Sequence, residues 1–209
     1  MARERVGAVK GLFVAFEGVD RSGKTTQLQL LAQRLSEKHE VLLTREPGGT
    51  PVAEAIRVLL LADDVQMSAR CEALLFAAAR ADHVERTIRP ALERGAVVIS
   101  DRFVDSSLAY QGVARGLGVD DVERINHWAT DALEPDLTIM LDLPIGTSSQ
   151  RDGEVDRMEN EGELFQARVR RGLLDLAGRA AHRYAVIDAS PSVDEVADLV
   201  WAAVPEPWR

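Results

Sequence analysis

The clearest structural signal in the sequence is the segment LFVAFEGVDRSGKT, which runs from Leu12 to Thr25. Its first five residues are apolar, as in a buried strand, and its last eight match the pattern G-x-x-x-x-G-K-T. The two glycines allow a tight turn whose backbone N–H groups point toward phosphate oxygens, and a following helix would add its positive N-terminal end. The segment therefore predicts a nucleotide-phosphate site.

Two side chains of this loop have distinct expected roles. Lys24 is expected to reach the β- and γ-phosphates of a nucleotide. Thr25 can give its hydroxyl to Mg²⁺, an ion that prefers phosphate and carboxylate oxygens. A chance glycine-rich loop is the alternative, but the helical spacing of apolar residues from Leu28 to Leu35 favours a phosphate site.

Composition sets the class of protein. The chain has 209 residues, 46% of them hydrophobic, which is enough for the core of a single domain spanning 1–209. Its net charge of −9 disfavours nonspecific binding to nucleic acid or to anionic membranes. The sequence shows neither a signal-peptide core nor an apolar run as long as a membrane span, so we expect a cytoplasmic protein. Cys71 is the only cysteine, which excludes an intrachain disulfide.

Short apolar runs alternate with segments of helical spacing. The runs lie at 12–16, 41–43, 97–99, 137–141 and 184–187, and each is interpreted as a buried parallel strand. The alternation predicts an α/β protein with a three-layer, doubly wound fold and a five-stranded parallel sheet. Ligands of such a sheet bind beyond the carboxyl ends of its strands. Polar clusters follow four of the runs, at 45–50, 101–103, 142–144 and 188–190.

Three clusters carry candidate chemistry. Arg102 follows a strand end, where a guanidinium can hold a phosphate through two hydrogen bonds, although a surface ion pair with Asp101 is the alternative. Asp101 itself is expected to orient Arg102 or a metal-bound water. Phe76 and Arg80 are four residues apart and would share a helix face, offering a base an aromatic surface beside a donor. The segment 106–112 adds hydroxyl and amide groups, for which turn or capping roles remain equally open.

The combined pattern resembles the thymidylate kinase family of P-loop nucleoside monophosphate kinases over nearly the whole chain. The resemblance rests on the segments FEGVD (16–20), TREPGGT (44–50), LFAAAR (75–80), DRF (101–103), AYQG (109–112) and DRME (156–159). It implies a P-loop kinase fold that transfers a phosphoryl group from ATP to dTMP with Mg²⁺. A homodimer and a mobile lid are implied as well.

The resemblance also implies roles for individual residues. On the dTMP side, Phe76 would stack on thymine, Arg80 would donate to a thymine oxygen and Arg102 would bind the phosphate. Ser107, Tyr110 and Gln111 match positions near the base and deoxyribose, and Asp20 matches an acid near both the acceptor and the metal that Thr25 holds. The loop expected to bind ATP comprises Gly18, Val19, Asp20, Arg21, Ser22, Gly23, Lys24, Thr25 and Thr26. The turn at 188–190 resembles the adenine-side loop, and Glu17 is either a second carboxylate at this centre or a polar cap on its strand.

The lid of the family matches residues 146–157, and here the chain departs from the pattern. Many bacterial relatives carry several arginines in this stretch, whereas this chain has only Arg151 before its Gly-Glu-x-Asp-Arg motif. Its phosphate loop contains Arg21 instead. An arginine from either segment can stabilise the transferring phosphoryl group, and we assign that role first to Arg21 and second to Arg151. Together with Lys24 and Arg102 these are the candidate catalytic residues.

Other functions remain open at this point. A kinase for a different deoxynucleoside monophosphate would use the same phosphate residues, and Arg80 is the discriminator because a cationic donor suits O4 of thymine or uracil and opposes the amine of cytosine. The sequence does not separate dTMP from dUMP. A nucleotide-gated interaction protein is the alternative from another class. The Leu74 to Leu92 helix is a possible dimer contact, or its apolar residues are core.

Overall fold

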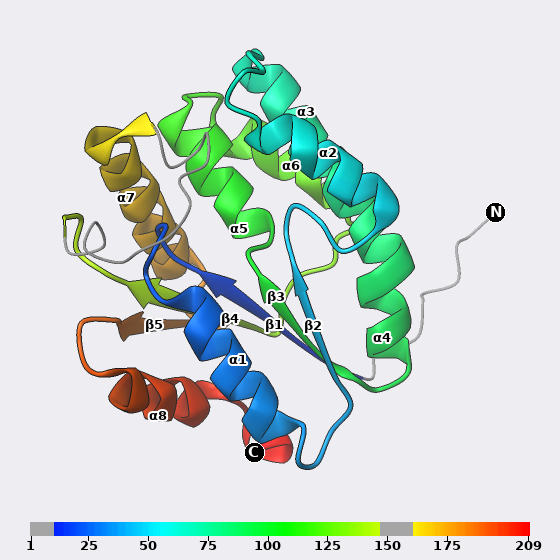
Figure 1. Cartoon of the computed structure of the whole chain (residues 1–209), viewed down its shortest axis with the longest axis vertical. Coiled ribbons are helices and arrows are strands. Elements are labelled where there is room, and N and C mark those ends of the chain that lie inside the picture. Colours follow the sequence, from blue (N-terminus) through cyan, green and yellow to red (C-terminus); the bar gives the residue numbers. More distant parts are fainter. Residues whose placement is uncertain (1–10, 147–160) are drawn as a thin grey trace.

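The computed structural model describes residues 11–146 and 161–209, and its centre is a parallel β-sheet (Figure 1). The strand order is β2-β3-β1-β4-β5, and every neighbouring pair is parallel. The predicted α/β class and five-stranded parallel sheet are therefore confirmed. The strands are β1 (Leu12–Glu17), β2 (Val41–Arg45), β3 (Val97–Asp101), β4 (Leu137–Asp142) and β5 (Tyr184–Asp188).

At least one helix follows each strand. The helices are α1 (Lys24–Leu35), α2 (Pro51–Leu61), α3 (Ala69–His83), α4 (Arg89–Glu93), α5 (Val104–Ser107), α6 (Val119–Ala129), α7 (Glu163–Arg179) and α8 (Val193–Ala203). Two π-helical segments, η1 (Val84–Ile88) and η2 (Leu108–Ala114), continue α3 and α5, and a 3₁₀ turn, η5 (Glu206–Trp208), ends the chain. In the described part of the chain, no helix combines the length and the apolarity that a membrane span needs.

Alternating side chains of β1 build the two halves of the core. Leu12, Val14 and Phe16 pack with α1 and α8, whereas Phe13 and Ala15 pack with η1 and α4. Because successive residues of a strand point to opposite faces, an all-apolar strand has helices on both sides. This pattern gives the predicted three layers of helix, sheet and helix.

The expectation that all five strands are buried is wrong for the two outer ones. β1, β3 and β4 are buried nearly throughout, but Leu43 on β2 and Val186 on β5 are exposed. β2 and β5 form the edges of the sheet, so each has a neighbouring strand on one side only. A short apolar run predicts a strand, but it does not show the strand's position in the sheet.

The strand ends bring the site together. Phe16 of β1 and Arg45 of β2 both align with Asp101 of β3, so three loops leave the sheet at the same level. The loop after β1 runs directly into α1, with Gly23 at φ +95° as the residue before the helix. Cys71 lies exposed on α3, away from these loops and within the predicted helix.

Candidate active site

A cavity of about 670 Å³ opens at the carboxyl edge of the sheet. The phosphate loop, the ends of β2 and β3, and parts of α3 and η2 line it, together with the loop before α8. Within the described part of the chain, the predicted site residues that line this cavity are Asp20, Arg21, Ser22, Gly23, Lys24, Thr25, Thr26, Phe76, Arg80, Arg102, Ser107, Tyr110 and Gln111. Gly18 and Val19 contact the site through their backbone only, and Arg151 lies outside the described residues.

The phosphate loop holds its lysine through backbone carbonyls. The Lys24 ammonium is buried and donates to the carbonyl oxygens of Gly18 at 3.1 Å and Val19 at 2.9 Å. Burial and the neighbouring positive charge of Arg102 lower the pKa of Lys24. Gly18 has φ +146°, and a Cβ at this position would lie 2.6 Å from the carbonyl oxygen of Leu141, so the loop requires glycine here.

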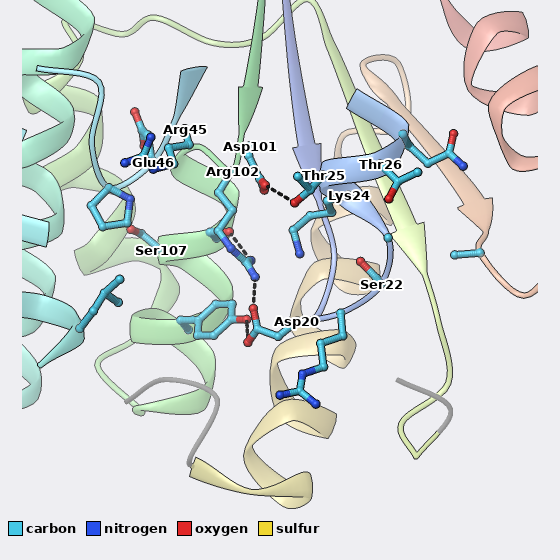
Figure 2. Close-up of a pocket in the computed structure, with 18 of the residues that line it drawn as sticks. Asp20, Ser22, Lys24, Thr25, Thr26, Arg45, Glu46, Asp101, Arg102 and Ser107 are labelled. Atoms are coloured by element: carbon cyan, nitrogen blue, oxygen red, sulfur yellow. Dashed lines mark hydrogen bonds and ion pairs between the residues drawn. The ribbon is translucent and has the colours of Figure 1, made fainter. Parts of the chain in front are cut away.

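Thr25 and Asp101 form the group of oxygens that best fits a divalent cation. The Thr25 hydroxyl donates to Oδ2 of Asp101 at 3.5 Å (Figure 2). Oδ1 of Asp101 is buried and has no hydrogen-bond partner within residues 11–146 and 161–209. A hydroxyl beside a carboxylate with an unused oxygen is a donor set that Mg²⁺ accepts. The sequence analysis missed Asp101 as a ligand, although its position at the end of the strand beside β1 was a usable signal.

Asp20, the other predicted metal ligand, makes different contacts. Its Oδ1 pairs with the Arg102 guanidinium (Figure 2). Its Oδ2 accepts from the Tyr110 hydroxyl at 3.1 Å and the Gln166 amide at 3.2 Å. Burial alone would raise the pKa of Asp20, but the positive charges of Arg102 and Lys24 lower it. The carboxylate thus joins the phosphate loop to β3, η2 and α7, and its role at a metal stays a prediction.

The backbone of Arg102 has a conformation that few residues other than glycine adopt. Its φ is +69°, in the left-handed region, and its backbone N–H donates to the Phe16 carbonyl at 2.9 Å. Its guanidinium donates to the Gly18 carbonyl at 3.1 Å and to the Ser106 hydroxyl at 3.0 Å, and it lies 5.2 Å from the centre of the Tyr110 ring. The ion pair of Arg102 is with Asp20, in the site, so the alternative of a surface pair with Asp101 is wrong.

Glu17 holds the residues that follow Arg102. Its buried carboxylate accepts from the backbone N–H groups of Phe103 at 2.9 Å and Ser106 at 3.1 Å, and from the Ser106 hydroxyl at 2.6 Å. These contacts make it a cap for the first turn of α5, which agrees with its interpretation as a strand-end polar residue. Burial, with a smaller contribution from the charge of Asp105, raises the pKa of Glu17 to about 7.

The far end of the cavity presents a ring and a buried guanidinium. Phe76 is half-buried and lines the cavity, so it is not simply core. Arg80 is only 2% exposed and donates to Glu46 at 2.5 Å, to the Ser107 hydroxyl at 3.1 Å, to the Phe103 carbonyl at 3.1 Å and to Asn126. Gln111, also buried, donates to Glu72 at 3.0 Å.

Several cavity or contact residues were not candidates in the sequence analysis. They are Arg45, Glu46, Arg57, Asn126 and Gln166. Arg45 and Glu46 follow β2 within a quoted motif, so their position gave a signal. Asn126 and Gln166 gave none, because they reach the site from distant helices. On the side of the predicted adenine loop, the cavity is lined by Ala189, Pro191, Val193 and Val196.

The arrangement offers two anion sites in one cavity. Lys24 of the phosphate loop, Arg102 and the ring of Phe76 all line this one cavity, so two cationic groups and an aromatic surface are available in it. A parallel sheet with this loop between its central strand and α1 is typical of P-loop proteins. The fold and the cavity together define a P-loop kinase.

Comparison with known proteins identifies the family. A family model for thymidylate kinase matches residues 16–200. The chain is 57% identical over 189 residues to a thymidylate kinase of Symbiobacterium thermophilum, covering 88% of both chains, and 50% identical to one of Bifidobacterium longum, covering 94% of this chain and 96% of that one. The crystal structure of thymidylate kinase from Ehrlichia chaffeensis is similar with a TM-score of 0.75 and 38% identity, covering 92% and 97% of the two chains. The chain belongs to the thymidylate kinase family.

The raised pKa of Glu17 predicts how stability depends on pH. Between its ordinary pKa of 4.5 and about 7, the folded chain keeps a proton that the unfolded chain has lost. The contribution of Glu17 to the free energy of unfolding therefore falls as pH rises through this range, by up to about 3 kcal/mol. We expect Glu17→Gln to flatten the fall, measured by urea unfolding at pH 5.0 and 7.5.

The control for this experiment is Glu37→Gln, which alters an exposed carboxylate on the loop after α1. It should leave the pH dependence of the wild type unchanged. If Glu17→Gln had the same slope as the wild type, the buried carboxyl would not be the group that takes up the proton.

Proposed function

We infer that the protein is a dTMP kinase, which transfers the γ-phosphoryl group of ATP to dTMP and releases ADP and dTDP. The single observation that carries this inference is one cavity that Lys24, Arg102, Phe76 and Arg80 all line. Membership of the thymidylate kinase family supports the same inference. No described residue has to form a covalent intermediate, because alignment and charge stabilisation carry most of the catalysis in phosphoryl transfer.

The residues proposed to bind phosphate groups and the metal have separate roles. The loop Gly18 to Thr26 binds the triphosphate of ATP, and Lys24 neutralises charge on its terminal phosphates. Thr25 and Asp101 would hold Mg²⁺, with Asp20 as a further carboxylate nearby, and the ion would neutralise charge on the phosphate oxygens when bound. Arg102 holds the phosphate of dTMP, for which its contacts with Gly18 and Ser106 fix it in the cavity.

The base residues select the acceptor. Phe76 offers its ring to thymine, and Arg80 offers an N–H to a thymine oxygen. Ser107, Tyr110 and Gln111 also line the cavity, and we assign them to the base and deoxyribose. A donor of fixed charge opposes the exocyclic amine of cytosine, which supports dTMP over dCMP as substrate.

The chain as a whole is proposed to be one cytoplasmic domain of residues 1–209, with a lid at about 146–157 that includes Arg151. One sheet carries the described helices, which supports the single domain. The lone cysteine and the substrates of the reaction support the cytoplasm. The net charge of −9 supports the absence of nucleic acid or membranes among the partners.

A homodimer is proposed through an apolar surface on α2, α3 and α6. Its large exposed side chains include Val58, which is 70% exposed, and Trp128, which is 85% exposed; the other members are Val52, Leu59 and Leu74. α3 packs against both α2 and α6, so these side chains belong to adjoining helices (Figure 1). Of the expected Leu74 to Leu92 contact, Leu74 is exposed and available, whereas Ile88 and Leu92 are fully buried. Exposed apolar patches of this kind mark protein interfaces.

The activity is tested by ADP release from Mg²⁺·ATP with dTMP, dUMP, dCMP, dGMP and AMP as acceptors. We expect strong turnover with dTMP, little with dCMP, and none when EDTA removes the metal or when the acceptor is omitted. Binding of ATP without turnover of any acceptor would instead favour a nucleotide-gated interaction protein. High turnover of dCMP with poor turnover of dTMP would refute the assignment of the base residues.

Arg21→Ala tests the assignment of the transition-state arginine. We expect kcat to fall by about 10³ to 10⁵, because the charge that develops on the transferring phosphoryl group loses its stabilising cation. The affinity for dTMP should change little, as measured by calorimetry. Arg151→Ala is the comparison, with a smaller expected loss; near-normal turnover of Arg21→Ala would move the role away from Arg21.

The dimer is tested by Val58→Glu, which places a charge on the proposed interface at a side chain that is 70% exposed. We expect the wild type to sediment as a dimer and the variant as a monomer, because an unpaired charge is costly in an apolar contact. Val186→Glu is the matched control, because Val186 is an exposed valine on β5, at the other edge of the sheet from β2 and outside the proposed interface. This variant should remain dimeric. A monomeric wild type at micromolar concentration would contradict the proposal.

A further inference from the structure

We propose that Glu46, itself held by His83, is a positioning residue that decides how Arg80 meets the base. The inference rests on the proposed function, because it takes Arg80 as the residue that reads the ring of the acceptor. It concerns two side chains that the phosphate chemistry does not use. Glu46 is the first residue after β2, and His83 is the last residue of α3.

The two residues form a buried chain of polar contacts from β2 to Arg80. Oε2 of Glu46 accepts from Nε of Arg80 at 2.5 Å, and its Oε1 faces Nδ1 of His83 at 3.0 Å. The far nitrogen of His83, Nε2, lies 2.6 Å from the hydroxyl of Thr44. Arg80 is 2% exposed and His83 is 0% exposed, so the contacts of both with Glu46 are buried.

The acceptor chemistry of Glu46 fixes the proton positions along this chain. An ionised carboxylate only accepts, so the nitrogen of His83 that faces it, Nδ1, carries a proton. In the neutral ring Nε2 then accepts the proton of the Thr44 hydroxyl. Both oxygens of Glu46 are thus occupied by donors, one from His83 and one from Arg80, and the carboxylate has one orientation.

These contacts use most of the N–H donors of the Arg80 guanidinium. A guanidinium has five N–H groups. Glu46 takes Nε–H, Ser107 and Asn126 take the two protons of Nη1, and the Phe103 carbonyl takes one proton of Nη2. Among the contacts of the described residues, one N–H of Nη2 is left for the cavity that Arg80 lines. A base that meets a single fixed donor must present an acceptor there, which suits a ring carbonyl and excludes an amine.

The position of His83 on its helix explains why it can support Glu46. Arg80 and His83 are three residues apart on α3, so both face the loop after β2. That loop packs directly on the imidazole, since a Cβ at Gly49 would lie 2.5 Å from Nε2 of His83. The helix that carries the base-reading arginine is therefore joined to the loop by the same two residues.

The test compares Glu46→Gln with the wild type. A glutamine keeps the shape but removes the negative charge that pairs with the Arg80 guanidinium and leaves a single acceptor oxygen, so the hold on Arg80 weakens and Arg80 can turn. We expect the KM for dTMP to rise by about tenfold or more while kcat changes by less than about threefold, and the ratio of kcat/KM for dTMP over dCMP to fall by about tenfold. The KM for ATP should stay at the wild-type value.

Variants of His83 separate positioning from general packing. His83→Leu removes the donor to Glu46 and is expected to lower the same dTMP-to-dCMP ratio, whereas His83→Asn keeps an N–H near the position of Nδ1 and should restore it. Asp82→Asn is the matched control: Asp82 neighbours His83, accepts from Thr50 in the same loop at 2.5 Å and does not contact Arg80. It should leave the ratio unchanged.

The outcomes distinguish this inference from the proposed function. A wild type that turns over no dTMP overturns both. A wild type that uses dTMP, with an unchanged dTMP-to-dCMP ratio in folded Glu46→Gln and His83→Leu, overturns only the positioning role. Equal losses for dTMP and ATP, together with a lower melting temperature in these two variants, would assign the two residues to packing and also overturn it.

Discussion

The parallel pairing of β1, β3 and β2 is the constraint on which the site depends. Phe16 and Arg45 both lie opposite Asp101. The phosphate loop, Arg102 and Glu46 therefore follow their strands within one or two residues of the level of Asp101 in the sheet. The backbone hydrogen bond from Arg102 to the Phe16 carbonyl at 2.9 Å extends this pairing past the end of β3. A shift of one residue in either pair would turn the strand-end side chains to the other face and separate them.

The same constraint explains how a chain with a net charge of −9 can offer two anion sites. Two cations of the cavity are held by carboxylates from the ends of other strands: Arg102, with a side chain 17% exposed, pairs with Asp20, and the buried Arg80 pairs with Glu46. Lys24 is held by two backbone carbonyls instead. Because a buried charge needs a close partner, these pairs fix the direction of each cation. Anion binding in this protein is therefore a property of local geometry and does not follow from the overall charge.

Contacts close in sequence were predictable, and contacts between distant segments were not. The loop from Gly18 to Thr25, the five strands and the place of the site followed from patterns within a few residues. The exposure of β2 and β5 did not, because strand order depends on which runs pair. Asn126 reaches Arg80 from 46 residues away and Gln166 reaches Asp20 from 146 residues away, and no local pattern marks either. Glu46 was visible as a motif residue, but its contact with Arg80 was not.

This difference corresponds to a division within the cavity. The phosphate side is built from one continuous loop and a strand end, so its shape is set by backbone geometry at Gly18 and Arg102. The Arg80 side is built from side chains of α3, α5, α6 and the residue after β2, which meet only in the folded chain. Changes in packing around α3 can therefore alter the direction of Arg80 without moving Lys24 or the loop that holds it. If Arg80 reads the base and Lys24 binds phosphate, as proposed, base choice depends on how the helices pack, whereas phosphate binding depends on the sheet and its first loop.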